Sequence, residues 1–314
     1  MNGYVAVVGS GMMGSSIGAM SALAGHKTVL TDIDQERAEA GKAKAVKCIQ
    51  QRRDHGLNSA EEAAVAVTLL ETAGDIHEIS GAALVIEAIV ENVAIKQGLF
   101  QRLDKLLPKE VPICSNTSGL RITDISRLCR YPERTVTTHF WLPGHLVPLV
   151  EVVMGENTDE AVAEMVIGEL KQWKKAPVLV RRDLPGQLAN RIFQAMIREA
   201  VDIVASGLAT AEDVDTAISC GMAMRFPVWG PLKHLDAIGL DLGMAVQETV
   251  LPGINAEKCP NAYIRTLVEA GDLGVKTGRG FYDWSQRQID KDIKKRDRFI
   301  IEAVKVTEQL NKEI

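Results

Sequence analysis

The sequence predicts an α/β fold, a doubly wound and mostly parallel sheet followed by an all-α C-terminal domain. Through about residue 183, short β-rich runs alternate with helical stretches, a pattern typical of a parallel sheet with helices on both faces. From Leu184 onward the chain shows helical periodicity without a clear strand, and residues 189–205 are strongly amphipathic. We therefore expect a sheet domain over residues 1–183 and a helical domain over residues 184–314.

Short runs rich in aliphatic and β-branched residues are the expected strands. In chain order they cover residues 5–9, 28–32, 84–88, 112–115, 135–139, 150–153 and 178–180. Between the second and third runs, residues 35–73 contain few helix breakers, so we expect a helical hairpin inserted there. In the helical domain, Gly230-Pro231 and the glycine-rich residues 274–280 mark loops.

Composition and charge exclude several classes of protein. The chain has 314 residues, 46% hydrophobic and 25% charged, which is ordinary for a globular protein and enough for two cores. A net charge of -5 with scattered basic residues argues against nucleic-acid binding. No apolar run reaches the length of a membrane span and the start lacks secretion-signal features, so we expect a cytoplasmic protein. The five cysteines are odd in number and lack metal-ligand spacing, which predicts reduced thiols and no metal site.

The most informative motif joins the first strand to the first helix. Gly9, Gly11 and Gly14 have the G-x-G-x-x-G spacing directly after an apolar run. In a βαβ unit of Rossmann type these glycines permit a tight turn, close approach of a pyrophosphate and helix-strand packing, while the helix N-terminus attracts the anion. Asp32 ends the second run, where a carboxylate accepts hydrogen bonds from the adenosine ribose and repels a 2′-phosphate. We therefore predict NAD as the cofactor, with Gly9, Gly11, Met12, Met13, Gly14 and Asp32 as contacts.

A dinucleotide fold does not define a reaction, so the chemistry must come from side chains at the carboxyl ends of the strands. Three polar groups fall there, namely residues 115–119 (Ser-Asn-Thr-Ser-Gly), His139 and Glu151. A histidine with a buried carboxylate on its far nitrogen is suited to take a hydroxyl proton. His139 and Glu151 form that pair if their strands are neighbours, and the reaction then needs no metal. The alternative is that His139 caps a strand and Glu151 makes a surface ion pair.

Further motifs follow one another along nearly the whole chain. They comprise Gly9 to Gly14, residues 85–92 (Val-Ile-Glu-Ala-Ile-Val-Glu-Asn), Ser115 to Ser118, His139-Phe140 with Pro143, Leu149 to Glu151, Pro185-Gly186 followed by Asn190-Arg191, and residues 274–282 (Gly-Val-Lys-Thr-Gly-Arg-Gly-Phe-Tyr). Together they resemble the 3-hydroxyacyl-CoA dehydrogenase family. The resemblance implies an NAD-dependent oxidoreductase that acts on a CH-OH group and dimerises through its helical domain.

The resemblance also implies a role for each matching polar residue. His139 is the general base, Glu151 orients it, and Ser118 and Asn190 hydrogen-bond the reacting oxygen. Asn116 joins Ser118 as a substrate contact. The residues implied to contact the cofactor are Glu91, Lys96, Ser118 and Lys276. For the charged residues in this set the alternative is a solvated surface charge, and for Asn190 it is a polar group on a helix.

Two departures from the family pattern bear on the substrate. Acyl-CoA enzymes usually read His-Phe-Phe-Asn-Pro, whereas this chain reads His-Phe-Trp-Leu-Pro, with Leu142 in place of the amide. Residues 222–231 contain Arg225 and look more like the branch that oxidises free hydroxy acids such as L-gulonate or carnitine. An arginine there can bind a substrate carboxylate in a bidentate fork, although it can equally extend from a loop into solvent.

Two further arginines instead favour an acyl-CoA substrate. Arg52 and Arg53 lie on the expected hairpin, where acyl-CoA enzymes hold the nucleotide end of CoA. A solvated helix face explains them equally well.

The sequence therefore predicts NAD-dependent oxidation of a 3-hydroxy acid to the 3-oxo acid, with proton transfer to His139. A 3-hydroxyacyl-CoA dehydrogenase for short chains is the close alternative. A non-catalytic NAD-binding structural protein is the alternative of another class, since a lens crystallin belongs to the family. The expected partners are a small-molecule substrate and a second copy of the chain, with neither nucleic acid nor membrane.

Overall fold

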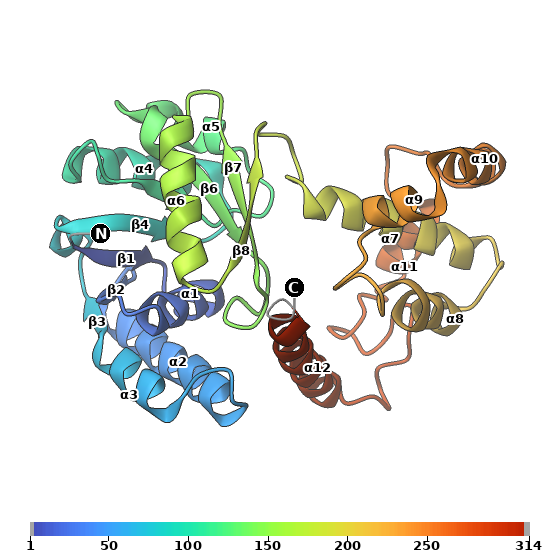
Figure 1. Ribbon diagram of the computed structural model, residues 1–314, viewed down its shortest axis with the longest axis horizontal. Coiled ribbons are helices and arrows are strands. Elements are labelled where there is room, and N and C mark those ends of the chain that lie inside the picture. Colours follow the sequence, from blue (N-terminus) through green and yellow to red (C-terminus); the bar gives the residue numbers. More distant parts are fainter. Residues whose placement is uncertain (1–2, 311–314) are drawn as a thin grey trace. The chain divides into compact units, whose positions relative to one another are not determined.

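The computed structural model describes residues 3–310 and divides into two compact units, shown in Figure 1. The first unit ends at Leu188 and the second begins at Ala189. We call them the sheet unit and the helical unit. The predicted fold class is confirmed, because a mostly parallel sheet with flanking helices precedes a region built of helices.

The sheet unit contains eight strands in the order β3-β2-β1-β4-β5-β6-β7-β8. Neighbouring strands are parallel except β6 and β7, which are antiparallel. The strands are β1 (Tyr4–Val8), β2 (Thr28–Thr31), β3 (Leu70–Ala73), β4 (Ala82–Glu87), β5 (Ile113–Ser115), β6 (Thr135–Phe140), β7 (Leu149–Met154) and β8 (Ala176–Val180). The helices are α1 (Met12–Leu23), α2 (Gln35–Asp54), α3 (Ala60–Thr68), α4 (Val93–Leu106), α5 (Ile122–Ile125) and α6 (Glu160–Gln172), with short 3-10 turns at Ile76–Ile79, Ser126–Leu128 and Pro132–Arg134.

Two apolar cores cover the two faces of this sheet. Alternate residues of a strand point to opposite faces, so Val5 and Val7 of β1 enter one core while Ala6 enters the other. The first core packs α1, α2, α3 and α6 against the sheet, and the second packs α4 and α5. The runs of buried residues on both faces are what a parallel sheet covered by helices requires.

The sheet brings its functional segments to one edge. The order of strands reverses at β1, which lies between β2 and β4, and such a switch point leaves a crevice at the carboxyl ends of the strands. The glycine loop follows β1, Asp32 follows β2, residues 116–119 follow β5, and His139 lies near the end of β6. Because β7 runs antiparallel to β6, Glu151 near the start of β7 comes to the same edge.

The expected hairpin over residues 35–73 is wrong at its end. Helices α2 and α3 are present, but residues 70–73 form strand β3 at the edge of the sheet. This four-residue run reads Leu-Glu-Thr-Ala and resembles the end of a helix by composition. Parallel pairing with β2 makes it a strand, with Leu70 and Ala73 buried against the two cores. Such tertiary pairing routinely overrides local propensity.

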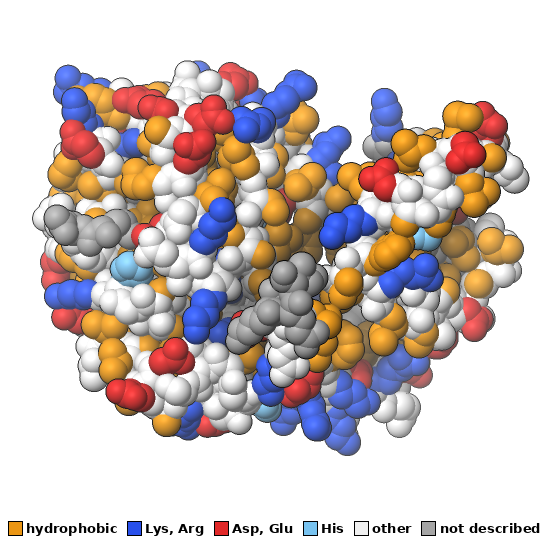
Figure 2. Space-filling view, viewed as in Figure 1, with side chains coloured by type: hydrophobic (Ala, Val, Ile, Leu, Met, Phe, Trp, Pro, Cys, Tyr) orange, Lys and Arg blue, Asp and Glu red, His pale blue; other side chains and the backbone are white. Residues whose placement is uncertain are grey.

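The helical unit contains α7 (Ala189–Ala205), α8 (Ala211–Thr216), α9 (Pro231–Ile238), α10 (Leu240–Val250), α11 (Ala262–Glu269) and α12 (Ile289–Leu310), with a π-helical turn at Ala217–Met222 and a 3-10 turn at Leu251–Gly253. Few of its apolar side chains are buried, and many large ones are exposed, as the hydrophobic surface in Figure 2 shows. Exposed examples include Phe193, Met224, Leu240 and Phe299. Within residues 3–310, no helix combines the length and apolar character needed to cross a membrane.

Candidate active site

The glycine loop after β1 has a backbone that only glycine fits at two positions. Gly9 has φ +92, and a Cβ there would lie 2.7 Å from the carbonyl oxygen of Ala88. A Cβ on Gly14 would lie 1.8 Å from the carbonyl oxygen of Gly9. A Cβ on Gly11, by contrast, would meet nothing within 4 Å. The open space over Gly11, at the N-terminus of α1, fits the pyrophosphate of a dinucleotide.

Asp32 lies beside this loop and is held by it. Its Oδ2 accepts hydrogen bonds from the backbone N–H and the hydroxyl of Ser10, at 2.7 and 2.8 Å, and its Oδ1 accepts one from the N–H of Ile33 at 2.9 Å. Partial burial acts to raise the pKa of Asp32, but these hydrogen bonds outweigh it and lower the pKa below its ordinary value. A carboxylate has about four acceptor positions, so this anion retains capacity for ribose hydroxyls.

A buried ion pair supports the edge of the sheet between the glycine loop and β5. Glu87, at the end of β4, is fully buried, and Lys96 of α4 is only 1% exposed. Glu87 Oε1 accepts from Lys96 Nζ at 2.5 Å and from the N–H of Ile89 at 2.6 Å, while its Oε2 accepts from the hydroxyl of Ser115 at 2.6 Å. Lys96 is therefore not a solvated surface charge, and that alternative is wrong for this residue. Sequence reasoning missed Glu87, although an acid at the end of an apolar strand is a usable signal.

Glu91 organises the turn that follows β5. Its Oε1 accepts from the hydroxyl of Thr117 at 2.6 Å and from the N–H groups of Ser118 and Gly119 at 3.0 and 3.1 Å. Its Oε2 lies 3.4 Å from Lys96 Nζ. Partial burial acts to raise the pKa of Glu91, but the hydrogen bond from Thr117, the charge of Lys96 and the two N–H groups lower it below its ordinary value. The anion thus fixes the loop that carries Ser118.

His139 and Glu151 face each other across β6 and β7. The two residues are paired in the register of the antiparallel strands, and His139 Nδ1 lies 2.7 Å from Glu151 Oε2. Glu151 is fully buried and His139 is 8% exposed. A carboxylate on Nδ1 keeps the proton on that nitrogen, so Nε2 presents its lone pair. The strands of His139 and Glu151 are neighbours, so the predicted pair is formed.

Side-chain and backbone donors hold Glu151 in place. Besides His139, the indole Nε1 of Trp141 donates to Oε2 at 3.0 Å, and the N–H of Leu188 donates to Oε1 at 2.9 Å. The adjacent Gln187 has φ +52 and donates from Nε2 to the carbonyl of Thr117 at 2.9 Å. Sequence reasoning missed both Trp141 and Gln187 as parts of the site. For Trp141, the available signal was a tryptophan at a position where the family usually has phenylalanine.

Asn116 ties the turn after β5 to the strand that carries His139. Its Oδ1 accepts from the N–H of Phe140 at 2.9 Å, and its own N–H donates to the carbonyl of Glu87 at 2.7 Å. The amide oxygen of Asn116 is therefore engaged, and its amide nitrogen is the group that can face a ligand. The structure thus brings together Asn116, Ser118, Glu91 and the His139–Glu151 pair on the sheet unit.

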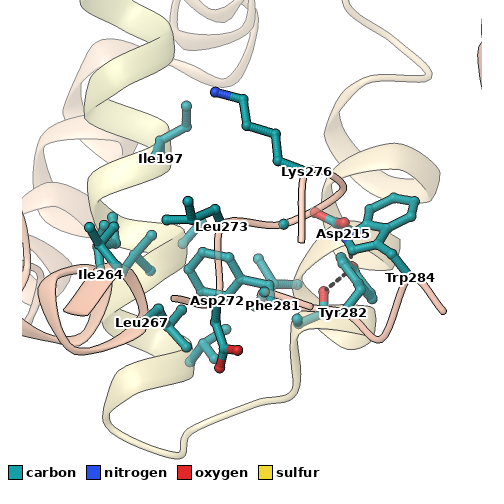
Figure 3. A pocket seen from close by; sticks show the side chains of 18 residues that line it. Ile197, Asp215, Ile264, Leu267, Asp272, Leu273, Lys276, Phe281, Tyr282 and Trp284 are labelled. Carbon is teal, nitrogen blue, oxygen red and sulfur yellow. Dashed lines mark hydrogen bonds between the residues drawn. The ribbon is translucent and has the colours of Figure 1, made fainter. Parts of the chain in front are cut away.

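The remaining predicted site residues belong to the helical unit. Asn190 lies at the start of α7 and accepts a hydrogen bond from Gln194, and Arg225 is exposed in the turn before α9. Lys276 is exposed on the glycine-rich loop, at an apolar cavity of about 560 Å³ within this unit, shown in Figure 3. Their roles stay predictions.

Comparisons with known proteins identify the family. A family model described as "3-hydroxyacyl-CoA dehydrogenase, NAD binding domain" matches residues 4–184, and the C-terminal domain model of the same family matches residues 186–284. The chain belongs to the 3-hydroxyacyl-CoA dehydrogenase family. It is accordingly an oxidoreductase acting on a CH-OH group, and its cofactor is NAD.

Two curated members of the family illustrate its range. The chain is 36% identical over 286 residues to a "Probable 3-hydroxybutyryl-CoA dehydrogenase" of Bacillus subtilis, covering 90% of this chain and 98% of the relative. It is 30% identical over 304 residues to the 5-formyl-3-hydroxy-2-methylpyridine 4-carboxylate 5-dehydrogenase of Mesorhizobium japonicum, covering 97% and 98%. A crystal structure of a dehydrogenase with that same pyridine substrate, described as an NAD+ dependent dismutase, aligns with a TM-score of 0.88 at 29% identity, over 98% of this chain and 99% of that one.

Proposed function

We propose that this dehydrogenase oxidises the 3-hydroxyl of a small hydroxy acid that carries a free carboxylate, giving the 3-oxo acid. The observation that carries the proposed oxidation is the 2.7 Å contact between His139 Nδ1 and buried Glu151. His139 Nε2 takes the hydroxyl proton, and Glu151 stabilises the imidazolium that forms. NAD would supply the acceptor for the hydride that leaves the carbon bearing this hydroxyl.

The other predicted residues divide between the cofactor and the substrate. The glycine loop, Met12, Met13 and Asp32 hold the adenosine and pyrophosphate end of NAD. On the substrate side, Ser118, the amide nitrogen of Asn116 and Asn190 hydrogen-bond the reacting oxygen. Glu91 supports Ser118 through the loop contacts described above and, with Lys96 and Lys276, completes the proposed cofactor set.

The arginines favour a free acid over a CoA thioester. Arg52 is 5% exposed and donates from Nε to Asn58 Oδ1 at 2.8 Å and from a terminal nitrogen to the carbonyl of His145 at 2.6 Å. The side chain of Arg52 is therefore committed to the interior, and the alternative of a solvated helix face is wrong for this residue. Arg225 is exposed and makes no ion pair with any residue between 3 and 310, so its guanidinium is available for a substrate carboxylate.

The relatives support both substrate classes. The pyridine carboxylate dehydrogenase acts, by its name, on a free acid, and it matches nearly the whole of this chain. A 3-hydroxyacyl-CoA dehydrogenase remains the second candidate, because the Bacillus subtilis relative named for 3-hydroxybutyryl-CoA has the higher identity over 90% of the chain.

Initial rates of NADH formation test the proposal directly. Free 3-hydroxy acids and the matching 3-hydroxyacyl-CoA thioesters are compared at equal concentration, with wild type and Arg225→Ala. We expect faster turnover of a free acid, and a raised KM for that acid in Arg225→Ala. Oxidation of thioesters alone, or an unchanged KM in the variant, contradicts the free-acid assignment. Tight NADH binding without turnover of any substrate would instead support the structural-protein alternative.

We also propose a cytoplasmic homodimer formed through the helical unit. The exposed apolar side chains of this unit support the dimer. Few apolar side chains of the unit are buried, so a second copy that covers the exposed ones stabilises the fold. Light scattering at micromolar concentration should give twice the 34.2 kDa chain mass. A monomeric mass would contradict the dimer.

A further inference from the structure

Trp141 shares one carboxylate oxygen with His139. Its indole Nε1 donates to Glu151 Oε2 at 3.0 Å, and His139 Nδ1 lies 2.7 Å from the same oxygen. The rings of Trp141 and His139 stand 5.7 Å apart at an interplanar angle of 54°. Two donors on one oxygen of a fully buried carboxylate make a short network that links the side chain after Phe140 to the proposed base.

Phenylalanine, which the family usually has at this position, cannot make this contact because it has no donor. An N–H donor stabilises the charged form of a carboxylate and draws on the lone pairs that the imidazole proton also uses. The carboxylate therefore stabilises an imidazolium less strongly than it would with His139 alone. The same bond also restrains the rotation of the carboxyl group, which fixes the direction in which the imidazole points.

We propose that Trp141 is a positioning residue that orients Glu151 and weakens its stabilisation of protonated His139, extending the working range of the base to lower pH. The inference rests on the proposed function, in which His139 is the base. It goes beyond that function by assigning a role to a side chain that acts on His139 through Glu151.

Other charged groups on the neighbouring elements have their own partners. Lys175, just before β8, donates to the carbonyls of Gly144 and Val147 in the loop after β6. Lys96 pairs with Glu87 beyond β5. Among the described residues, Glu151 is the acid in contact with His139. The indole bond therefore acts on the charge that the imidazole feels most directly.

The sheet unit contains a matched control. Trp173 donates from Nε1 to Glu169 Oε1 at 2.8 Å, and His26 Nε2 lies 2.6 Å from that same oxygen. This second tryptophan-glutamate-histidine group lies where α6 ends, and Trp173 belongs to the apolar core. It reproduces the indole-carboxylate hydrogen bond beside a histidine, in a place that the proposed reaction does not use, although His26 Nε2 itself makes no hydrogen bond there with any residue of the described range.

The contact itself can be observed without any substrate. The chain has four tryptophans, so a ¹⁵N correlation spectrum shows four indole N–H signals, and Trp141→Phe identifies one of them by its loss. We expect Glu151→Gln to move this signal upfield, because a neutral amide is a weaker acceptor than a carboxylate. The Trp173 signal, assigned with Trp173→Phe, should stay in place. An unmoved Trp141 signal in Glu151→Gln overturns the proposal.

The functional consequence is read from the pH dependence of kcat/KM for hydroxyl oxidation, with the substrate that the rate comparison selects. Trp141→Phe should move the acid limb of the profile to higher pH by roughly half a unit to one unit, a part of what one hydrogen bond to a charged group contributes. Trp173→Phe should leave the limb in place. In a Glu151→Gln background, Trp141→Phe should cause no further shift.

These outcomes separate the inference from the proposed function. If His139→Gln remains fully active, the proposed base is wrong. If His139→Gln is inactive while Trp141→Phe lowers kcat without moving the acid limb, the base stands and the role given to Trp141 is wrong. A shift of the limb to lower pH also contradicts the proposal.

Discussion

A side chain on Gly14 would collide with the backbone of Gly9, since its Cβ would lie 1.8 Å from the carbonyl oxygen. No rotamer relieves this contact, because the Cβ position is set by the backbone. The first turn of α1 therefore packs against the end of β1 at a distance that only glycine permits. The same backbone leaves the space over Gly11 open.

The two glycines should consequently respond differently to alanine. Gly14→Ala is expected to lower the free energy of unfolding by about 1–3 kcal/mol or more, since backbone must move to relieve the overlap. Gly11→Ala should leave stability nearly unchanged, because Gly11 has φ -64 and an open site, yet weaken NADH binding by about tenfold or more. Chemical denaturation and NADH fluorescence titration measure the two effects. Unchanged NADH affinity in Gly11→Ala would place the pyrophosphate elsewhere.

His139→Gln should separate chemistry from cofactor binding. The amide keeps a polar group of similar length but cannot take the hydroxyl proton, so we expect kcat to fall by roughly 10²–10⁴, the usual contribution of a general base. NADH affinity should stay nearly intact, since the glycine loop and Asp32 lie at other strands. The checks are steady-state kinetics and an NADH titration on the same preparation. A fully active variant would remove the proposed mechanism.

The neighbouring arginines of α2 give a test of the substrate class. Arg52→Ala leaves the carbonyl of His145 and the amide of Asn58 without this donor, so we expect a loss of about 1–3 kcal/mol in stability. Arg53 is exposed and pairs with the adjacent Asp54, so Arg53→Ala should change stability by less than about 0.5 kcal/mol. If the enzyme acts on free acids, Arg53→Ala should also leave KM unchanged. A raised KM for CoA thioesters in Arg53→Ala would favour the CoA alternative.

The sequence predicted the parts of the site that depend on strand order. His139 and Glu151 are twelve residues apart at the ends of two β-rich runs, so their pairing needs only that the runs be neighbours. Strand β3 was missed because its short sequence resembles the end of a helix and becomes a strand only by pairing with β2.

Other parts of the site depend on how side chains are oriented, which a sequence pattern does not encode. The motif that contains Glu87 was recognised, but nothing in it shows that Lys96, nine residues later, turns inward to the same carboxylate. The indole bond from Trp141 is of the same kind, because it depends on the rotamers of two side chains on different strands or loops.

Lys175 should make the stability of the sheet unit depend on pH. Burial lowers the pKa of Lys175 to about 7, with the nearby charge of Arg52 as a second cause, while the unfolded chain keeps the ordinary value of 10.5. Between these two values the unfolded chain binds a proton that the folded chain lacks. The free energy of unfolding should therefore rise with pH across this window by up to about 1.4 kcal/mol per unit. The stabilisation is lost as the pH drops toward 7.

Lys175→Met removes this titration while keeping an unbranched apolar side chain of similar length. The difference in unfolding free energy between wild type and Lys175→Met should grow in favour of wild type from pH 7 to pH 9, whatever its sign at pH 7. At pH 7 that sign depends on two opposing effects, the removal of a buried charge and the loss of its bonds to Gly144 and Val147. Urea denaturation at several pH values measures the slope, and parallel curves for the two proteins would show that Lys175 stays protonated throughout.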